Sequence, residues 1–320
     1  MLIRWAKPED ADGIVRLIRR RIGWMDSRGL KNQWNDVDYL TIYPPDYFRQ
    51  NIESFLVAEE DGILIGAVAA YTEDRKWPGK REPAFYLHHL VANEAFPGTG
   101  RRLLDAAERE AVRRGIRFIR GDSNLRSQEL SRYYEARGCR AKGLIREGSY
   151  IGVLREKRLD GPNPDYAAIG FLDTEGLTDG EISLQLERKA QADPERGYVP
   201  AYHFAILDPS GRKAGTCDLR IGYGESLYYG GHIGYAVDAG YRGHHYAARA
   251  CRLLFGLARR HGMGYLIITC DPENTASART ALAAGFEWVE RAVLPETNEM
   301  RLTKGKEEAE IYAVSLDGIR

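Results

Sequence analysis

The sequence has few cysteines and no closely spaced pair of them. Its four cysteines are scattered over 320 residues, and none belongs to a C-x-x-C motif. This spacing predicts neither a disulfide framework nor a structural zinc site. Unpaired thiols are typical of proteins from a reducing compartment, so we expect a cytoplasmic protein.

Long apolar runs and an excess of charge of one sign are also missing. No apolar run reaches the roughly 18 residues needed to cross a membrane, and the first residues, MLIRWAKPEDADG, lack the apolar segment of a signal peptide. The 46 Lys and Arg residues balance the 46 Asp and Glu residues. We therefore expect neither a membrane nor a nucleic acid as the main partner.

The length and a polar stretch near the middle predict two domains. A chain of 320 residues is long for one core, and roughly 150 residues per domain is usual. Residues 156–165, EKRLDGPNPD, are charged, contain proline and glycine, and show no apolar period, as is typical of a linker. We predict an N-terminal domain at 1–155 and a C-terminal domain at 166–320.

The most informative stretch is VDAGYRGHHYAARACRLL, from Val237 to Leu254. It follows an alternating apolar segment at 231–237, which predicts a strand, and it opens a predicted helix that reaches about His261. A strand, a loop of small and basic residues and a helix expose free N–H groups at the positive end of the helix dipole. Such an arrangement suits an anion such as a pyrophosphate.

The residues in and after this loop resemble the GCN5-related N-acetyltransferase (GNAT) superfamily, and within it the ribosomal-protein-alanine acetyltransferase-like branch. Arg242 and Ala247 match the family's acetyl-CoA loop, Arg/Gln-x-x-Gly-x-Gly/Ala. His245 stands where glycine is usual, and its Cβ narrows the allowed backbone conformations. Farther on, Asn274 and Ser277 match the family's Asn-x-x-Ser element.

The resemblance implies acetyl-CoA as the cosubstrate, without a metal. The amides of Ala236 and Val237 would hold the thioester carbonyl, and the loop at 242–247 would hold the pyrophosphate. Ser277 is the candidate proton donor to the leaving thiolate and Asn274 the candidate for orienting the pantetheine arm, while helix capping is the alternative for both. The cofactor-binding residues expected in this half are Ala236, Val237, Arg242, Gly243, His244, His245, Tyr246, Ala247, Asn274 and Ser277.

The first half resembles the same family through other residues. The element at 130–138 is similar to the family's L-x-x-Y-Y-E-x-x-G, whose second tyrosine, here Tyr134, is commonly the general acid; a core tyrosine is the alternative. Its phosphate loop is one residue short, has Ala95 in place of Arg or Gln, and contains Pro97, which offers no N–H. The cofactor-binding residues expected here are Val91, Gly98, Thr99 and Gly100. We therefore expect the second domain to be catalytic and the first to be a degenerate copy.

The predicted fold class is α/β with a mixed sheet. It consists of two tandem GNAT folds, each a mostly antiparallel sheet flanked by helices, with a splayed central strand pair. In the second half the patterns predict a strand at 167–172, an amphipathic helix at 179–190, a hairpin at 201–221 and a glycine- and tyrosine-rich loop at 222–231.

The implied activity is transfer of an acetyl group to a primary amine. We expect a small-molecule amine, amine antibiotics included; the alternatives are a protein N-terminus or lysine, and a non-catalytic CoA-binding scaffold. The candidate general bases are Glu225, His88, His89 and His232, each with a structural role as the alternative. The fused pair predicts either a monomer with an internal pseudo-dimer or a homodimer.

Overall fold

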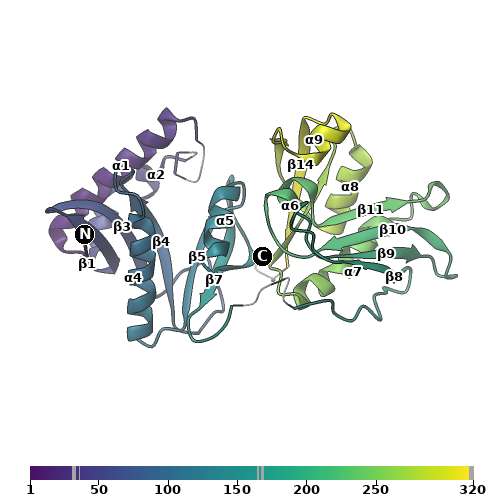
Figure 1. The fold of residues 1–320 in the computed structure, drawn as a ribbon, viewed down its shortest axis with the longest axis horizontal. Helices are drawn as coiled ribbons and strands as arrows, with labels where there is room; N and C mark the ends of the chain where they lie inside the picture. Colours follow the sequence, from purple (N-terminus) through teal and green to yellow (C-terminus); the bar gives the residue numbers. More distant parts are fainter. Residues whose placement is uncertain (31–33, 36, 164–165, 167–168, 317–320) are drawn as a thin grey trace. The chain divides into compact units, whose positions relative to one another are not determined.

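Two compact units make up the chain. The computed structural model describes residues 1–316 except 31–33, 36, 164–165 and 167–168. The first unit contains residues 1–140 and 146–163, and the second contains 141–145 and the chain from 164 onward (Figure 1). The final strand of the first unit continues to Arg158, so the first residues of the stretch predicted as a linker are part of a sheet.

The first unit is built on a seven-stranded sheet in the order β1-β2-β3-β4-β5-β7-β6. Strands β4 and β5 run parallel and pair only from Ala84 to Tyr86, so they separate toward their carboxyl ends. This separation confirms the splayed central pair. The strands are β1 (Leu2–Trp5), β2 (Phe55–Glu60), β3 (Ile63–Tyr71), β4 (Ala84–Ala92), β5 (Phe118–Asn124), β6 (Arg140–Glu147) and β7 (Tyr150–Arg158).

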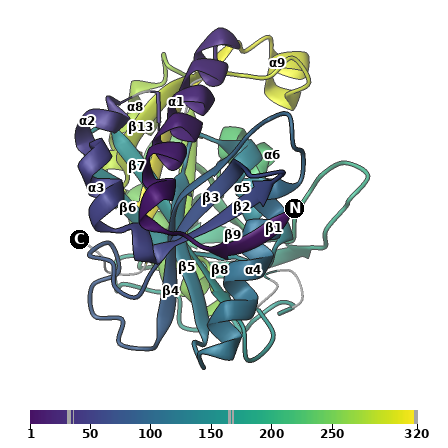
Figure 2. The ribbon, with the colours of Figure 1, turned by 90° about the vertical axis from the view of Figure 1, so that its left-hand side faces the viewer.

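Helices cover both faces of this sheet. Successive side chains of a strand point to opposite faces, so one strand contacts helices on both. Phe55 and Val57 of β2 pack in the cluster that contains α1, whereas Leu56 and Ala58 pack with α4. Figure 2 shows α1, α2 and α3 together, apart from α4. The helices are η1 (Pro8–Asp10), α1 (Ala11–Ser27), α2 (Tyr39–Ile42), α3 (Pro45–Gln50), η2 (Ile52–Ser54), α4 (Thr99–Arg113) and α5 (Gln128–Ala136).

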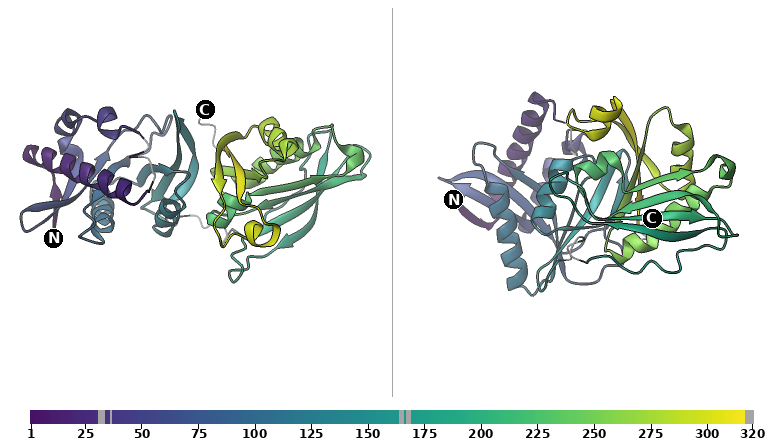
Figure 3. Two further views of the ribbon diagram at one scale, coloured as in Figure 1. Left: turned by 90° about the horizontal axis from the view of Figure 1, so that it is seen from above. Right: turned by 45° about the vertical axis from the view of Figure 1, so that its right-hand side comes forward.

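The second unit repeats the strand order in two smaller sheets. These are β11-β10-β9-β8 and β12-β14-β13, with α7 and α8 in the same apolar cluster as both sheets (Figure 3). Its strands are β8 (Ser183–Ala190), β9 (Ala201–Leu207), β10 (Lys213–Arg220), β11 (Ile233–Val237), β12 (Tyr265–Cys270), β13 (Glu287–Val293) and β14 (Glu308–Ser315). Its helices are α6 (Glu225–Gly230), η3 (Ala239–Tyr241), α7 (Tyr246–Arg260), α8 (Thr275–Ala284) and α9 (Glu299–Lys304).

The start of the second unit differs from the prediction. The stretch 179–190 is not a helix, since β8 begins at Ser183, and Ile182 and Leu184 are buried at the two-residue spacing of a strand. Residues 169–172 are not in a strand, and 167–168 lie outside the described residues. The expected loop at 222–231 contains α6.

The described helices include none that is long and apolar enough to cross a bilayer. All four cysteines are buried free thiols.

Candidate active site

Strand β4 contains a β-bulge at its centre. Ala67 of β3 faces Val91 and Ala69 faces His88, so β4 has one residue more than β3 over this interval. The extra residue falls at 89–90, and His89 has a left-handed φ of 54°. A bulge bends a strand and re-aims its backbone. Here it lies beyond the short segment over which β4 pairs with β5.

A glycine on β5 marks the point at which the two strands separate. An ideal Cβ on Gly121 would lie 3.0 Å from the carbonyl oxygen of Leu87 on β4. Any other residue would push the strands apart at this position, because that distance is shorter than ordinary van der Waals contact.

A cavity of about 420 Å³ opens beside the separated strands. Its lining includes β4 from Leu87 to Ala92, the loop after it and the start of α4, together with Tyr133 and Tyr134 of α5. Aromatic side chains of residues 34–43 also line it. The cavity brings together the predicted residues Val91, Gly98, Thr99, Gly100 and Tyr134.

The loop end of the cavity has the geometry of an anion site. Gly98 precedes α4 with a left-handed φ of 83°, and the Thr99 hydroxyl donates to the Phe96 carbonyl at 2.7 Å. Gly98, Thr99 and Gly100 line this end, where the positive end of the dipole of the 15-residue helix lies. Arg20 pairs with Glu94 at 2.6 Å, which offsets the negative charge of that carboxylate beside the loop.

Tyr134 lines this cavity and also a smaller one of about 30 Å³ that contacts Arg155. Burial raises the pKa of the Tyr134 phenol, so the hydroxyl keeps its proton near neutral pH. Among the described residues, none is hydrogen-bonded to this hydroxyl. A protonated phenol facing the cavity is suited to donate a proton.

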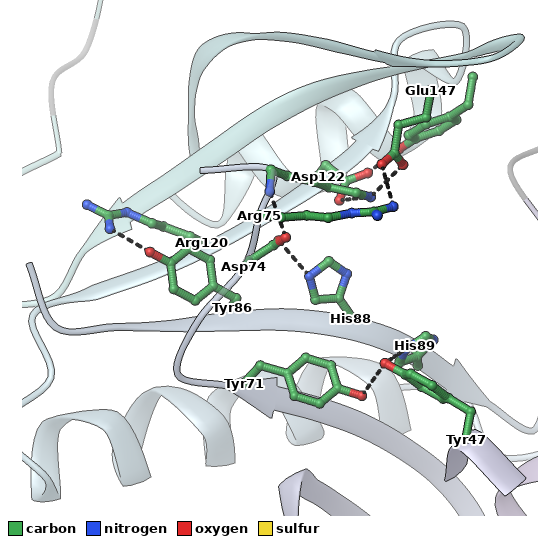
Figure 4. A network of polar contacts seen from close by, with 12 residues as sticks. Tyr47, Tyr71, Asp74, Arg75, Tyr86, His88, His89, Arg120, Asp122 and Glu147 are labelled. Atoms are coloured by element: carbon green, nitrogen blue, oxygen red, sulfur yellow. Dashed lines mark hydrogen bonds and ion pairs between the residues drawn. The ribbon is translucent and has the colours of Figure 1, made fainter. Parts of the chain in front are cut away.

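His88 is held by a carboxylate at the wall of the same cavity. Its Nε2 lies 2.8 Å from Asp74 Oδ2 (Figure 4). Burial alone would raise the pKa of Asp74, but the hydrogen bonds from His88 and from the Lys76 backbone N–H hold it below its usual value. An ionised Asp74 accepts the Nε2–H of His88, so in the neutral ring the free lone pair is on Nδ1, as a general base requires.

An ion-pair network that the motifs did not predict lies next to this pair. Lys76 Nζ is 3.0 Å from Asp122 Oδ1 and 3.5 Å from Glu147 Oε2, and the Tyr150 hydroxyl donates to Asp122. Lys76 and Asp122 line the cavity and are almost fully buried. Because an unpaired buried charge is costly, each of the two charges is stabilised by its partner. Lys76 lies in the polar stretch between β3 and β4, where no motif marks it.

The surroundings of His89 and His232 fit the structural role that was the alternative to that of a general base. Burial lowers the pKa of each to about 3, and both ring nitrogens of each are hydrogen-bonded. His232 accepts from the Ile267 N–H at 2.9 Å and lies 3.0 Å from the Gly222 carbonyl oxygen. The backbone N–H of His232 also donates to the Ile267 carbonyl at 2.7 Å, so His232 joins the start of β11 to β12.

The predicted catalytic pair of the second unit has the geometry of a helix cap. Asn274 precedes α8, and its side chain accepts from the Ser277 N–H at 3.0 Å. The Ser277 hydroxyl lies 2.9 Å from that of Tyr235. In the first unit Ser127 caps α5 in the same way, accepting from the Leu130 N–H. The residue seven positions after the cap is Tyr134 in the first unit and Ala281 in the second, so the second unit has no phenol at this position.

The predicted phosphate loop of the second unit has the shape of the first with different side chains. His245 precedes α7 with a φ of 57°, the position that Gly98 holds before α4. The guanidinium of Arg242 donates to the Val237 carbonyl at 3.3 Å. Predicted residues on this side that remain exposed or partly exposed are Ala236, Val237, Arg242, Gly243, His244, His245 and Tyr246. Glu225 begins α6, and its role stays a prediction.

A mixed sheet with a splayed, bulged strand pair and a helix N-terminus at its opening defines an acyl-transfer fold of the α/β class. Both halves match family models: residues 20–138 match the acetyltransferase (GNAT) family, and residues 162–287 match an acetyltransferase (GNAT) domain. The chain belongs to the GNAT acetyltransferases, and it carries two such domains in tandem.

Solved structures of other acetyltransferases are similar to about half of the chain. They include a GNAT acetyltransferase from Listeria monocytogenes (TM-score 0.42, 24% identity, 49% of this chain and 94% of that one). Another is the PaiA N-acetyltransferase from Thermoplasma acidophilum with coenzyme A (0.40, 18%, 49% and 98%). A third is YncA from Salmonella typhimurium with acetyl-CoA (0.39, 20%, 52% and 98%). No curated protein sequence matches the chain.

Proposed function

We propose that the protein is an acetyl-CoA-dependent N-acetyltransferase for a primary amine of a small molecule, and that the first unit carries out the transfer. The motifs alone favoured the second unit. The observation that supports the first unit instead is that one cavity is lined by the phosphate-loop residues, the β4 bulge, Tyr134 and His88.

The walls of this cavity fit acetyl-CoA. The backbone N–H groups of Gly98 and Gly100 would bind the pyrophosphate, and Gly100 leaves space, since no atom lies within 4 Å of the position its Cβ would take. The backbone of β4 at the bulge is available to the thioester carbonyl, because β5 is not paired with it there. Acetyl-CoA supplies the acyl group as an activated thioester.

Two side chains of the first unit move the protons. His88 Nδ1 takes a proton from the amine, while the Asp74 carboxylate holds the ring through Nε2. Tyr134 gives its phenol proton to the leaving sulfur. General acid–base catalysis of this kind contributes about 10²- to 10⁴-fold each.

Aromatic side chains support a small amine as the substrate. Trp34 and Tyr39 stack with their ring centroids 5.0 Å apart, and Tyr43 follows at 5.1 Å from Tyr39. All three line the cavity and offer flat apolar surfaces with polar edges. The cavity volume is typical of small-ligand sites, which measure roughly 300–1,000 Å³.

Thiol release from acetyl-CoA tests the proposal with three acceptors: spermidine, an aminoglycoside and a peptide with N-terminal alanine. We expect turnover with a small amine, its loss in Tyr134→Phe and its retention in Ser277→Ala. Activity on the peptide alone would refute the small-molecule substrate. Loss in Ser277→Ala with retention in Tyr134→Phe would assign the reaction to the second unit. Tight acetyl-CoA binding without turnover on any amine would favour a scaffold.

A further inference from the structure

His89 adopts a backbone conformation that is costly inside a strand. Three non-glycine residues of the described chain have a positive φ: Asp61, His89 and His245. Asp61 is at a hairpin tip and His245 precedes a helix, whereas His89 is within β4. A left-handed conformation costs a residue with a Cβ about 1–2 kcal/mol. Other interactions of His89 must therefore hold the bulge in place.

The side chain of His89 provides these interactions. Its ring is 7% exposed and lies among aromatic rings, with Phe55 stacked on it at 5.9 Å. The Tyr39 hydroxyl is hydrogen-bonded to Nδ1, and Nε2 lies 3.3 Å from the Tyr47 hydroxyl. The Tyr47 hydroxyl in turn lies 2.9 Å from that of Tyr71 (Figure 4). Because the ring is neutral, one nitrogen accepts and the other donates.

These bonds join three parts of the first unit through one ring. Tyr39 belongs to α2 and lines the cavity, Tyr47 belongs to α3, and His89 is in the bulge of β4. A change in the ring would therefore disturb the bulge and the aromatic wall together. The corresponding strands of the second unit, β10 and β11, pair without a bulge from Ile233 to Val237.

We propose that His89 is a positioning residue for the transfer. Its ring fixes the β4 bulge against the α2–α3 wall, so that backbone N–H groups at the bulge stay aimed at the thioester carbonyl. This inference rests on the proposed function of the first unit. It predicts that polarisation of the carbonyl depends on His89, whereas binding of the rest of the cofactor at 98–100 does not.

Two conservative variants separate positioning from folding. His89→Phe keeps an aromatic ring among its neighbours but removes both hydrogen bonds, and Tyr39→Phe removes only the hydroxyl bonded to Nδ1. His261→Phe is the matched control: this histidine is 1% exposed and its Nε2 lies 2.7 Å from the Tyr202 hydroxyl, but it is in the second unit. We expect all three to lower Tm.

The experiment is infrared difference spectroscopy of acetyl-CoA labelled with ¹³C at the thioester carbonyl, together with calorimetric titration of CoA. We expect the downshift of the carbonyl band on binding to fall by about half or more in His89→Phe, and by less in Tyr39→Phe, because the polarising donors lose their fixed orientation. CoA affinity should stay within about threefold of the wild type, and His261→Phe should keep the full shift.

Two results would contradict the inference in distinguishable ways. A full shift in both His89→Phe and Tyr39→Phe would overturn the role of His89 alone. Binding and a full shift retained in Gly100→Glu would show that the carbonyl is held outside the first unit, which would overturn the proposed function as well. If His89→Phe does not fold, Tyr39→Phe still decides, because an unchanged band in that variant contradicts positioning through the Nδ1 bond.

Discussion

The two units have the same strand order but different insertions. In the first unit the chain forms the helices α1, α2 and α3 between β1 and β2. The corresponding strands of the second unit, β8 and β9, are joined by residues 191–200 alone. The second unit instead has α6 between β10 and β11. The aromatic wall of the cavity comes from the inserted region of the first unit. Repetition of a fold therefore does not repeat the parts added to the common sheet, and the aromatic wall is one of these parts.

The central strand pairs, β4–β5 and β11–β12, also differ between the two units. In the first unit β4 has a bulge and leaves β5, and a cavity fills the opening. In the second unit β11 is regular and belongs to a different sheet from β12, and His232 bridges the two strands with hydrogen bonds to Ile267. His232 thus joins two strands, whereas His89 joins the bulged strand to α2 and α3.

The largest expected effect concerns the helix that follows the central pair. Tyr134→Phe should lower kcat by about 10²- to 10³-fold, because the leaving sulfur loses its proton donor. Steady-state thiol release measures this. The matched change in the second unit, Ser277→Ala, should leave kcat within about twofold, since that hydroxyl bonds Tyr235. Equal losses in the two variants would show that both units are catalytic.

A smaller effect is expected at the base. His88→Gln should lower kcat/KM by about 10²-fold, because glutamine takes no proton from the amine. Steady-state thiol release with the amine as the varied substrate measures this. His203→Gln is the control, as His203 lies on β9 of the second unit and bonds Arg188. A kcat/KM that stays within about twofold of the wild type in His88→Gln would assign the base to another group.

The smallest effect is on stability rather than rate. The pKa of His232 is about 3 in the folded chain and about 6.5 when unfolded, so the unfolded state binds more protons between these values. Its contribution is fully present above pH 6.5 and falls with pH, by up to about 1.4 kcal/mol per pH unit. In His232→Gln the unfolding free energy of the second unit should be lower at pH 7 but depend less on pH between 6 and 4.

Urea denaturation at pH 7, 6, 5 and 4 measures this effect. Curves for the wild type and His232→Gln that stay parallel across this range would show that the histidine is not buried in its neutral form.

Much of the fold follows from local sequence patterns. The apolar segment AFYLHHLVA coincides with β4, and the Asp61-Gly62 pair, which is typical of a hairpin tip, lies between β2 and β3. The error at 179–190 has a physical cause: charged residues around Ile182, Leu184 and Leu186 fit an amphipathic helix as well as a strand, and only the pairing of β8 with β9 selects the strand.

The site was less predictable, because its decisive features depend on register and long-range contacts. The tyrosine motif identified Tyr134, and His88 was among the candidate bases. The bulge at His89 depends on how β3 pairs with β4, and Asp74 meets His88 only after the chain folds back. The Asn-x-x-Ser match was real as a motif, but in this chain Asn274 caps a helix. A motif match does not show the geometry that the folded chain builds around the motif.

The most direct test of the account is the stoichiometry of acetyl-CoA binding, measured by titration calorimetry on the wild type and two matched variants. Gly100→Glu and Ala247→Glu each place a carboxylate at the second residue of the helix after the loop, on α4 and α7 respectively. The account predicts a site that is lost in Gly100→Glu and retained in Ala247→Glu. Loss in Ala247→Glu alone, with binding intact in Gly100→Glu, would contradict it and place the cofactor in the second unit.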